Sequence, residues 1–178
     1  AMEDAELVIA DEPTPGLDKK TAMGVMDHFR QMADRGAGVL LITHDLELAV
    51  RSADRVTVLY GGRTVEETEA FSFLDEGLLK HPYTKALCRS MPGKWPSADA
   101  LENDRESGIP GIYEKGIWTM KLEARDISFR YGEGERQVLA HVDLTVESGE
   151  RVGIMAPSGF GKTTLLKILA GYERPESG

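Results

Sequence analysis

Ala156-Pro-Ser-Gly-Phe-Gly-Lys-Thr-Thr164 is the stretch that decides the fold of this chain. It follows an apolar run, Val152–Met155, and leads into Lys162–Ala170, where apolar residues recur at helical spacing. Gly159 and Gly161 permit a tight backbone that turns several N–H groups toward one anion. The helix that follows directs its positive N-terminal end at the same anion. The stretch therefore predicts a strand, a phosphate-binding loop and a helix.

The second half of this loop carries the residues expected to meet a nucleotide. Its Gly-Lys-Thr fits the phosphate-loop pattern of Gly, four residues and Gly-Lys-Ser/Thr, although Ala156 replaces the first glycine. We expect Lys162 to contact the β- and γ-phosphates, Thr163 to bind Mg²⁺, and Thr164 to donate to a phosphate oxygen. Ala156 fits if its position needs only a small residue, and it is strained if that position needs a positive φ. The other residues predicted to bind the nucleotide are Ser158, Gly159, Phe160 and Gly161.

An acidic strand near the other end of the chain complements this loop. Leu7-Val-Ile-Ala-Asp-Glu-Pro-Thr14 begins as a short apolar run, which is typical of a buried parallel strand, and continues into two carboxylates. We expect Asp11 to hold Mg²⁺ and Glu12 to orient and polarise an attacking water. His44 follows a second buried run, Val39–Ile42, and is placed to sense a γ-phosphate. A solvated acidic turn is the alternative for the carboxylates, and the histidine segment argues against it.

Composition and charge narrow the class of protein. At 178 residues, with 41% hydrophobic and 29% charged residues, the chain is typical of a soluble globular protein with a sizeable core. A net charge of −9 without a long basic block argues against a nucleic-acid partner. Cys88 is the only cysteine, which excludes an intramolecular disulfide and a cysteine-cluster metal site. The sequence has no signal pattern and no apolar run of roughly 18 residues, so we expect a cytosolic location.

Strands and helices alternate through residue 67 and again from residue 120. Asp18 is the expected N-cap of a helix over Lys19–Arg35, and Gly36 is its expected stop. The apolar side of this helix is predicted to be Met23, Met26, Phe29 and Met32. The other expected strands are Arg55–Tyr60, Arg63–Glu66, Leu122–Phe129, Val138–Val146 and Arg151–Met155, and the other expected helices are Leu46–Ser52, Phe71–Leu79 and Pro82–Arg89. Proline, glycine and charges across residues 91–118 predict a linker.

Together these segments resemble the ATP-binding cassette ATPases. Leu7–Glu12 resembles the Walker B strand with its catalytic glutamate, and Pro15-Gly-Leu-Asp18 resembles the D-loop, where the family more often has Ser-Ala in place of Pro-Gly. Leu41-Ile-Thr-His-Asp45 resembles the switch-histidine segment, and Tyr131 stands where the family places an aromatic that stacks on adenine. A structural tyrosine at a strand end is the alternative for Tyr131. The resemblance implies ATP and Mg²⁺ as cofactors and an incomplete α/β sheet of the P-loop NTPase, RecA-like type, largely parallel, with an antiparallel β element at the start of a second cassette.

The segment before the linker resembles one branch of this family. Lys80-His-Pro-Tyr-Thr-Lys-Ala-Leu87 and Ile109-Pro-Gly111 are similar to the tails of oligopeptide, dipeptide and nickel importer ATPases. That resemblance implies a subunit at the cytoplasmic face of the membrane that energises import through a separate membrane-spanning permease. A partner cassette and, indirectly, an extracytoplasmic substrate-binding protein are implied too. His81 and Tyr83 are expected to pack this tail onto its cassette.

The two ends of the chain resemble opposite halves of a cassette. Residues 1–67 are similar to the C-terminal half of a first cassette, 68–118 to an importer-type tail and linker, and 119–178 to the N-terminal half of a second. We therefore expect a fragment from the junction of a tandem protein, with ATP binding but little turnover, because the family's signature segment is absent. The halves could form one permuted core. In that core the family's sheet order would place Arg55–Tyr60 beside Arg151–Met155, followed by Val39–Ile42 and then by the strand that ends at Asp11. Arg151–Met155 would then pair with Val39–Ile42, and Lys162 would face the two carboxylates.

Two other classes of ATPase have features that this sequence lacks. Ribosome-associated tandem cassettes are joined by a long charged helical hairpin, unlike the proline- and glycine-rich residues 91–118. Chromosome-maintenance ATPases insert long coiled coils, and no sustained heptads are found here. A nucleotide-binding module without turnover stays open as an alternative.

Overall fold

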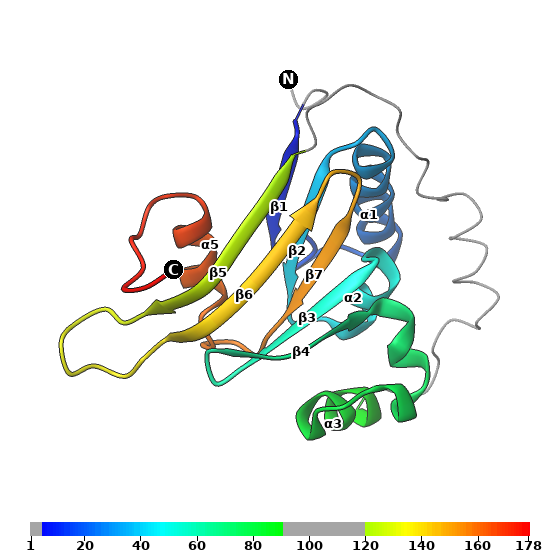
Figure 1. Ribbon diagram of the computed structural model, residues 1–178. Helices are drawn as coiled ribbons and strands as arrows, with labels where there is room; N and C mark the ends of the chain where they lie inside the picture. The colour runs from blue at the N-terminus through cyan, green and yellow to red at the C-terminus, as the bar shows by residue number, and fades with distance from the viewer. Residues whose placement is uncertain (1–4, 91–119) are drawn as a thin grey trace.

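A five-stranded, largely parallel sheet forms the centre of the molecule (Figure 1). The computed structural model describes residues 5–90 and 120–178. The strand order is β1 (Leu7–Asp11), β2 (Gly38–Thr43), β7 (Arg151–Met155), β3 (Arg55–Tyr60) and β4 (Arg63–Glu69). Only β4 is antiparallel to its neighbour in this sheet. A separate antiparallel pair consists of β5 (Lys121–Phe129) and β6 (Leu139–Glu147). The predicted α/β fold, with its antiparallel β element, is confirmed.

The strand before the phosphate loop lies between two strands from the other end of the chain. Along its length β7 pairs with β2, from Val39 opposite Arg151 to Thr43 opposite Met155. Its other edge pairs with β3. The predicted pairing of the two segments and the predicted strand order are therefore confirmed. The continuous apolar character of these strands explains their central place, because a parallel strand is covered on both faces.

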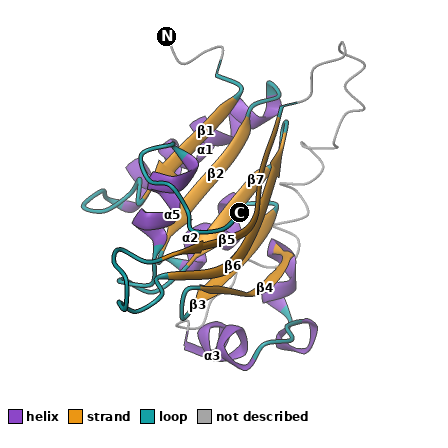
Figure 2. Ribbon diagram, turned by 60° about the vertical axis from the view of Figure 1, so that its left-hand side comes forward, coloured by secondary structure: helices purple, strands orange, loops and turns teal. Residues whose placement is uncertain are grey.

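Two different layers cover the two faces of the sheet (Figure 2). On one face, α1 (Lys19–Asp34) and α2 (Leu46–Ser52) pack against alternate strand residues such as Val39 and Leu41. On the other face, β5, β6 and α5 (Lys162–Leu169) form one core with Leu40 and Ile42. Alternation along β2 therefore divides the core between the two layers.

The first helix follows its sequence signals closely. Asp18 is the N-cap, and its carboxylate accepts the N–H groups of Lys20 and Thr21. After the helix Gly36 adopts a φ of +99°, which glycine tolerates best. The predicted apolar side is correct for Met26, Phe29 and Met32, but Met23 is 39% exposed. That prediction is wrong, since neither of the core clusters under the helix extends to Met23.

The segment after β4 differs from its prediction in detail. Two 3₁₀-helices, Ala70–Leu74 and Glu76–Leu78, replace the single helix expected over Phe71–Leu79. Asp75 separates them, because its side chain accepts the N–H of Gly77 and so begins a new turn. Helix α3 (Pro82–Ser90) follows, close to its predicted bounds. The predicted linker, residues 91–118, lies outside the described residues.

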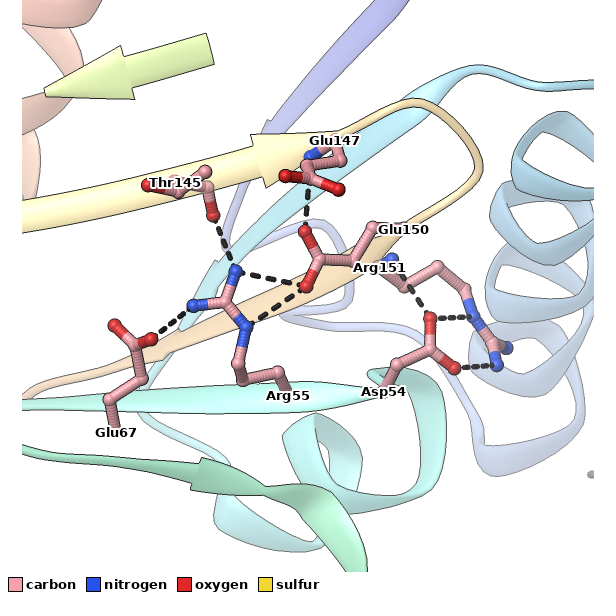
Figure 3. A network of polar contacts seen from close by, with 7 residues as sticks. All are labelled: Asp54, Arg55, Glu67, Thr145, Glu147, Glu150 and Arg151. Atoms are coloured by element: carbon pink, nitrogen blue, oxygen red, sulfur yellow. Dashed lines mark hydrogen bonds and ion pairs between the residues drawn. The ribbon is translucent and has the colours of Figure 1, made fainter. Parts of the chain in front are cut away.

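Charged side chains join the two ends of the chain at the N-terminal end of β7 (Figure 3). We call this the arginine network; its members are Asp54, Arg55, Glu67, Thr145, Glu147, Glu150 and Arg151. Arg55 Nε donates to Glu150 at 2.9 Å, and Arg55 Nη2 donates to the Thr145 carbonyl at 2.7 Å. Arg151 bonds both carboxylate oxygens of Asp54, at 3.2 and 2.7 Å. These contacts join residues more than 85 positions apart in sequence.

Across residues 5–90 and 120–178, none of the helices has the length and apolar character needed to traverse a bilayer.

Candidate functional site

The phosphate loop connects β7 to α5 and has the backbone that its sequence predicts. Gly159 and Gly161 have φ values of +80° and +88°. A Cβ at Gly161 would lie 2.7 Å from Leu139 Cδ2 and 3.1 Å from the Val138 carbonyl oxygen, so both conformation and space require glycine there. Ala156 is fully buried and does not have a positive φ. Its position therefore needs a small residue, and alanine meets that need without strain.

Lys162 lies in the interior of this loop. Its side chain is buried, and Nζ donates to the Ala156 carbonyl at 2.8 Å. The same Nζ lies 3.4 Å from Glu12 Oε1. The ammonium thus joins the phosphate loop to the acidic strand, as the permuted core predicts. An ammonium has three donors, so a single carbonyl bond and a long carboxylate contact leave capacity for an anion.

The two carboxylates reach the loop because β1 and β7 are parallel strands of one sheet. The C-terminal ends of parallel strands meet at one edge, where ligands of open α/β sheets bind. Asp11 ends β1, and Glu12 follows with a φ of +46°. This conformation is uncommon for a residue with a side chain, and the Glu12 N–H holds it by donating to the Ile42 carbonyl at 2.8 Å.

Glu12 is fixed by residues from the end of the neighbouring strand β2. His44 Nδ1 lies 2.7 Å from Glu12 Oε1, and the Thr43 hydroxyl donates to Oε2 at 3.3 Å. Burial tends to raise the pKa of Glu12, but the hydrogen bond and charge of His44, together with Lys162, outweigh burial and lower it. The carboxylate is therefore ionised at neutral pH, as a group that accepts a proton must be.

Asp11 has the opposite electrostatic situation. Burial and then the neighbouring charge of Glu12 raise its pKa, while Lys162 opposes the shift. A cation in the cleft would relieve this repulsion. Thr163, which lines the same cleft, offers a hydroxyl oxygen, and Mg²⁺ prefers such hard oxygen ligands. No cluster of three or more His, Cys, Asp or Glu residues suited to a metal occurs among residues 5–90 and 120–178. Asp11 and Thr163 alone are a donor set that fits a cation held largely by phosphate oxygens and water.

One cleft of about 440 Å³ brings most of these groups together. Its lining residues are Asp11, Glu12, Tyr131, Val138, Ser158, Gly159, Gly161, Lys162, Thr163 and Thr164. Two predicted site residues are not in the lining: His44 contacts the cleft through Glu12, and Phe160 lines a smaller neighbouring cavity of about 160 Å³. Val138 was missed, because an apolar residue at the start of a strand carries no signal of a site.

Tyr131 stands at the edge of this cleft. Its ring packs edge-to-face against Phe129, with ring centroids 4.9 Å apart, and Tyr131 as a residue is 55% exposed. The hydroxyl lies 3.0 Å from Thr164 Oγ1, so Thr164 bonds to Tyr131 here. A supported and exposed aromatic face beside a phosphate loop suits stacking with a flat base.

Known proteins resemble both ends of this chain. Residues 139–178 match the ABC transporter family model. The dipeptide transport ATP-binding protein DppD of Haemophilus influenzae is 38% identical over 62% of the chain and 33% of DppD. The oligopeptide transport ATP-binding protein OppD of Lactococcus lactis subsp. cremoris is 36% identical over 70% of the chain and 41% of OppD. The ribose import ATP-binding protein RbsA 1 of Rubrobacter xylanophilus is 32% identical over 98% of the chain and 30% of that relative.

These similarities extend beyond the loop alone. The chain spans less than half the length of the curated relatives it matches. No solved structure matches it. The match to RbsA 1 nevertheless runs through both the acidic strand and the phosphate loop, the two segments that form the cleft. In sequence, the chain is therefore similar to ABC transporter ATPases along both segments that form the cleft, and its residues 139–178 match the model of that family.

Proposed function

We propose that this chain binds Mg-ATP in the cleft between the phosphate loop and the acidic strand. One observation carries the proposal: Lys162 Nζ lies 3.4 Å from Glu12 Oε1, although the two residues are 150 positions apart. A buried lysine inside a glycine-lined loop, facing a carboxylate at a strand end, supports phosphoryl chemistry. Cleft, loop conformation and charge arrangement all support the same ligand.

Each residue then has a role that follows from its place. The N–H groups of the loop, with Lys162, hold the phosphates, and Tyr131 stacks on the adenine. Thr163 and Asp11 would hold Mg²⁺, and the bound ion would neutralise charge on the phosphate oxygens. As Lys162 turns to the phosphates, Glu12 is left with His44 and Thr43 and can orient a water and accept its proton. His44 senses the γ-phosphate while it holds Glu12 in place.

In a longer protein the same site would drive transport. We propose an ATP-hydrolysing importer subunit that works at the cytoplasmic face of a membrane with separate permease subunits, a partner cassette and, indirectly, a substrate-binding protein. The relatives named for dipeptide and oligopeptide transport support a peptide cargo, and the tail resemblance adds nickel; the relative named for ribose import supports a sugar as the competing cargo. The match to RbsA 1 over 98% of the chain supports a stretch that crosses a junction between cassettes.

Titration of the purified chain with a fluorescent ATP analogue and Mg²⁺ tests the binding. We expect saturable binding that weakens at least about tenfold in Lys162→Ala, because a charge-assisted contact to phosphate is lost. The matched control is Lys167→Ala, a lysine of the same helix that is absent from the cleft lining, and its affinity should equal that of the wild type. Equal affinity in Lys162→Ala and wild type would refute the proposal.

Phosphate release separates an ATPase from a module that only binds. We expect slow release from this chain alone, and loss of that release in Glu12→Gln, because the amide cannot accept a proton from water. Binding without any release above the Glu12→Gln background would favour the module without turnover.

A further inference from the structure

We propose that the tail helix α3 sets the nucleotide affinity of the phosphate loop through a column of three stacked rings: Tyr83, Tyr60 and Phe160. The inference rests on the proposed nucleotide site and adds positioning residues that lie outside its cleft. It gives the tail a part in nucleotide binding, in addition to packing on the cassette.

The column connects three separate segments. Tyr83 of α3 stacks on Tyr60 at the end of β3, with centroids 4.1 Å apart and planes at 28°. Tyr60 in turn stacks on Phe160 of the phosphate loop, with centroids 5.5 Å apart and planes at 14°. The Tyr60–Phe160 distance is within the range favourable for aromatic pairs, and the Tyr83–Tyr60 rings are in closer contact. A movement of the tail helix would therefore displace Phe160, the middle residue of the phosphate loop.

The base of the column is firmly held. Glu66 of β4 is buried and accepts the N–H groups of Lys80 and His81, at 2.6 and 3.0 Å. Burial tends to raise the pKa of Glu66, but Lys80, Thr84 and His81 together outweigh burial and lower the pKa. His81 then caps the helix, since its Nδ1 accepts the N–H of Tyr83 and its carbonyl accepts the N–H of Lys85. Tyr83 is thus fixed through its backbone as well as its ring.

A second contact leads from the tail to the same loop. Tyr83, Leu87 and Cys88 of α3 pack against a core cluster that includes Phe73 and Met155. Met155 is the last residue of β7, immediately before the loop begins. The tail helix therefore supports the strand that leads into the loop and also the ring in the middle of the loop.

The loop needs such support because of its own sequence. Phe160 stands between Gly159 and Gly161, both at positive φ, and glycine-flanked backbone has the largest conformational freedom to lose. Phe160 lines the smaller neighbouring cavity and is absent from the lining of the nucleotide cleft, so its stacking leaves the cleft open. Rings that order the loop in advance reduce the entropy lost when phosphate binds.

The test removes the ring from the column but keeps an apolar side chain at that position. In Tyr83→Leu we expect the affinity for the fluorescent ATP analogue to fall by about two- to tenfold, the range expected when an aromatic pair is lost. Amide hydrogen exchange over residues 158–163 should become faster, while β5 and β6 stay unchanged. Tyr83→Phe retains the ring and should retain wild-type affinity. Tyr172→Leu, at a tyrosine that is 83% exposed, is the control for loss of a surface tyrosine.

The outcomes separate this inference from the proposed function. Should Tyr83→Leu disturb folding, Tyr60→Leu breaks the same column at a residue that is 44% exposed. Unchanged affinity or unchanged loop exchange in these variants, with binding still lost in Lys162→Ala, would overturn the ring column alone. If Lys162→Ala also binds normally, the nucleotide site itself is wrong.

Discussion

At both ends of strand β7, charged side chains from the N-terminal half of the chain meet charged side chains from the C-terminal half. The two ends differ in how completely these side chains are paired. At its N-terminal end the arginine network pairs Arg55 and Arg151 with carboxylates and a carbonyl (Figure 3). Beyond its C-terminal end, Lys162 has one carbonyl bond and a 3.4 Å approach to Glu12. Charges whose partners are complete hold the fold together, and charges whose partners are incomplete are available to a ligand.

Exposure and pKa express the same difference. Arg55 and Arg151 are 17% and 19% exposed at the side chain. Burial tends to lower the pKa of Arg55, but Glu150 and Glu67 outweigh it and raise the pKa, so the charged form is favoured. At the other end, burial and the charge of Glu12 raise the pKa of Asp11, so its charged form is less favoured than it is in water. Raised and lowered pKa values side by side are typical of functional sites.

The largest expected effect comes from breaking the arginine network at the N-terminal end of β7. Arg55→Ala should lower the free energy of unfolding by about 3 kcal/mol, near the lower limit for a broken buried ion pair, because part of the site still touches water. The reason is that Glu150 and the Thr145 carbonyl lose their donor while they remain partly buried. Urea unfolding followed by circular dichroism measures it.

A matched ion pair on the surface is the control for this change. Arg55 contacts Glu150 through Nε and Nη2, and Arg89 likewise contacts Glu76 through two nitrogens. The side chain of Arg89, however, is 70% exposed. Arg89→Ala should therefore leave the unfolding curve unchanged. If the two alanine variants lose equal stability, the arginine network does not hold the two parts of the chain together.

The sequence predicted most of the fold, because the strands are buried and local signals are strong. Arg55–Tyr60, Leu46–Ser52 and Arg151–Met155 have the predicted bounds, since each is a short segment with clear boundaries. The order of the strands also came from the sequence, but only through the family resemblance, because periodicity does not identify which strands pair. Met23 shows the limit of periodicity: helical spacing places it on the apolar side, and the end of the core leaves it exposed.

The site was predicted less completely than the fold. Motif spacing identified the residues that meet in the cleft, and their roles there stay predictions. Phe160 and Tyr83 each belong to a recognised segment, but their stacking through Tyr60 had no signal, because the three rings are far apart in sequence and share no motif. The arginine network had no signal either. Contacts between side chains of distant segments depend on the register of the strands, and that register is set only by the folded sheet.

The next largest effect concerns the contact between Lys162 and Glu12, beyond the C-terminal end of β7. Glu12→Gln should bind the ATP analogue about fivefold more tightly, because it removes a negative charge that attracts Lys162 and repels phosphates, a difference of roughly 1 kcal/mol. Fluorescence titration measures it. Glu150→Gln, at the other end of β7, removes one charge as well and should leave the affinity unchanged while it lowers stability. Weaker binding in Glu12→Gln would contradict the view that Glu12 and phosphate compete for Lys162.

The smallest effect is the pH dependence of stability, which should have opposite signs at adjacent carboxyl groups. The pKa of Glu12 is lowered from 4.5, so the folded state binds this proton more weakly than the unfolded state does. Its contribution is present above pH 4.5 and is lost as pH falls through the lowered pKa. The pKa of Asp11 is raised from 3.8, so its contribution to stability grows as pH falls through the raised pKa toward 3.8.

Two variants separate these contributions. Glu12→Gln should lose less stability than the wild type between about pH 5 and pH 3, because the Glu12 contribution is gone while burial, the largest cause of the Asp11 shift, remains. Asp11→Asn should lose more, because its compensating gain is gone. Urea unfolding at several pH values measures both slopes. Slopes that change in the same direction would mean that the two carboxyl groups share one environment, and the open end of β7 would then lack the charge contrast that suits it to Mg-ATP.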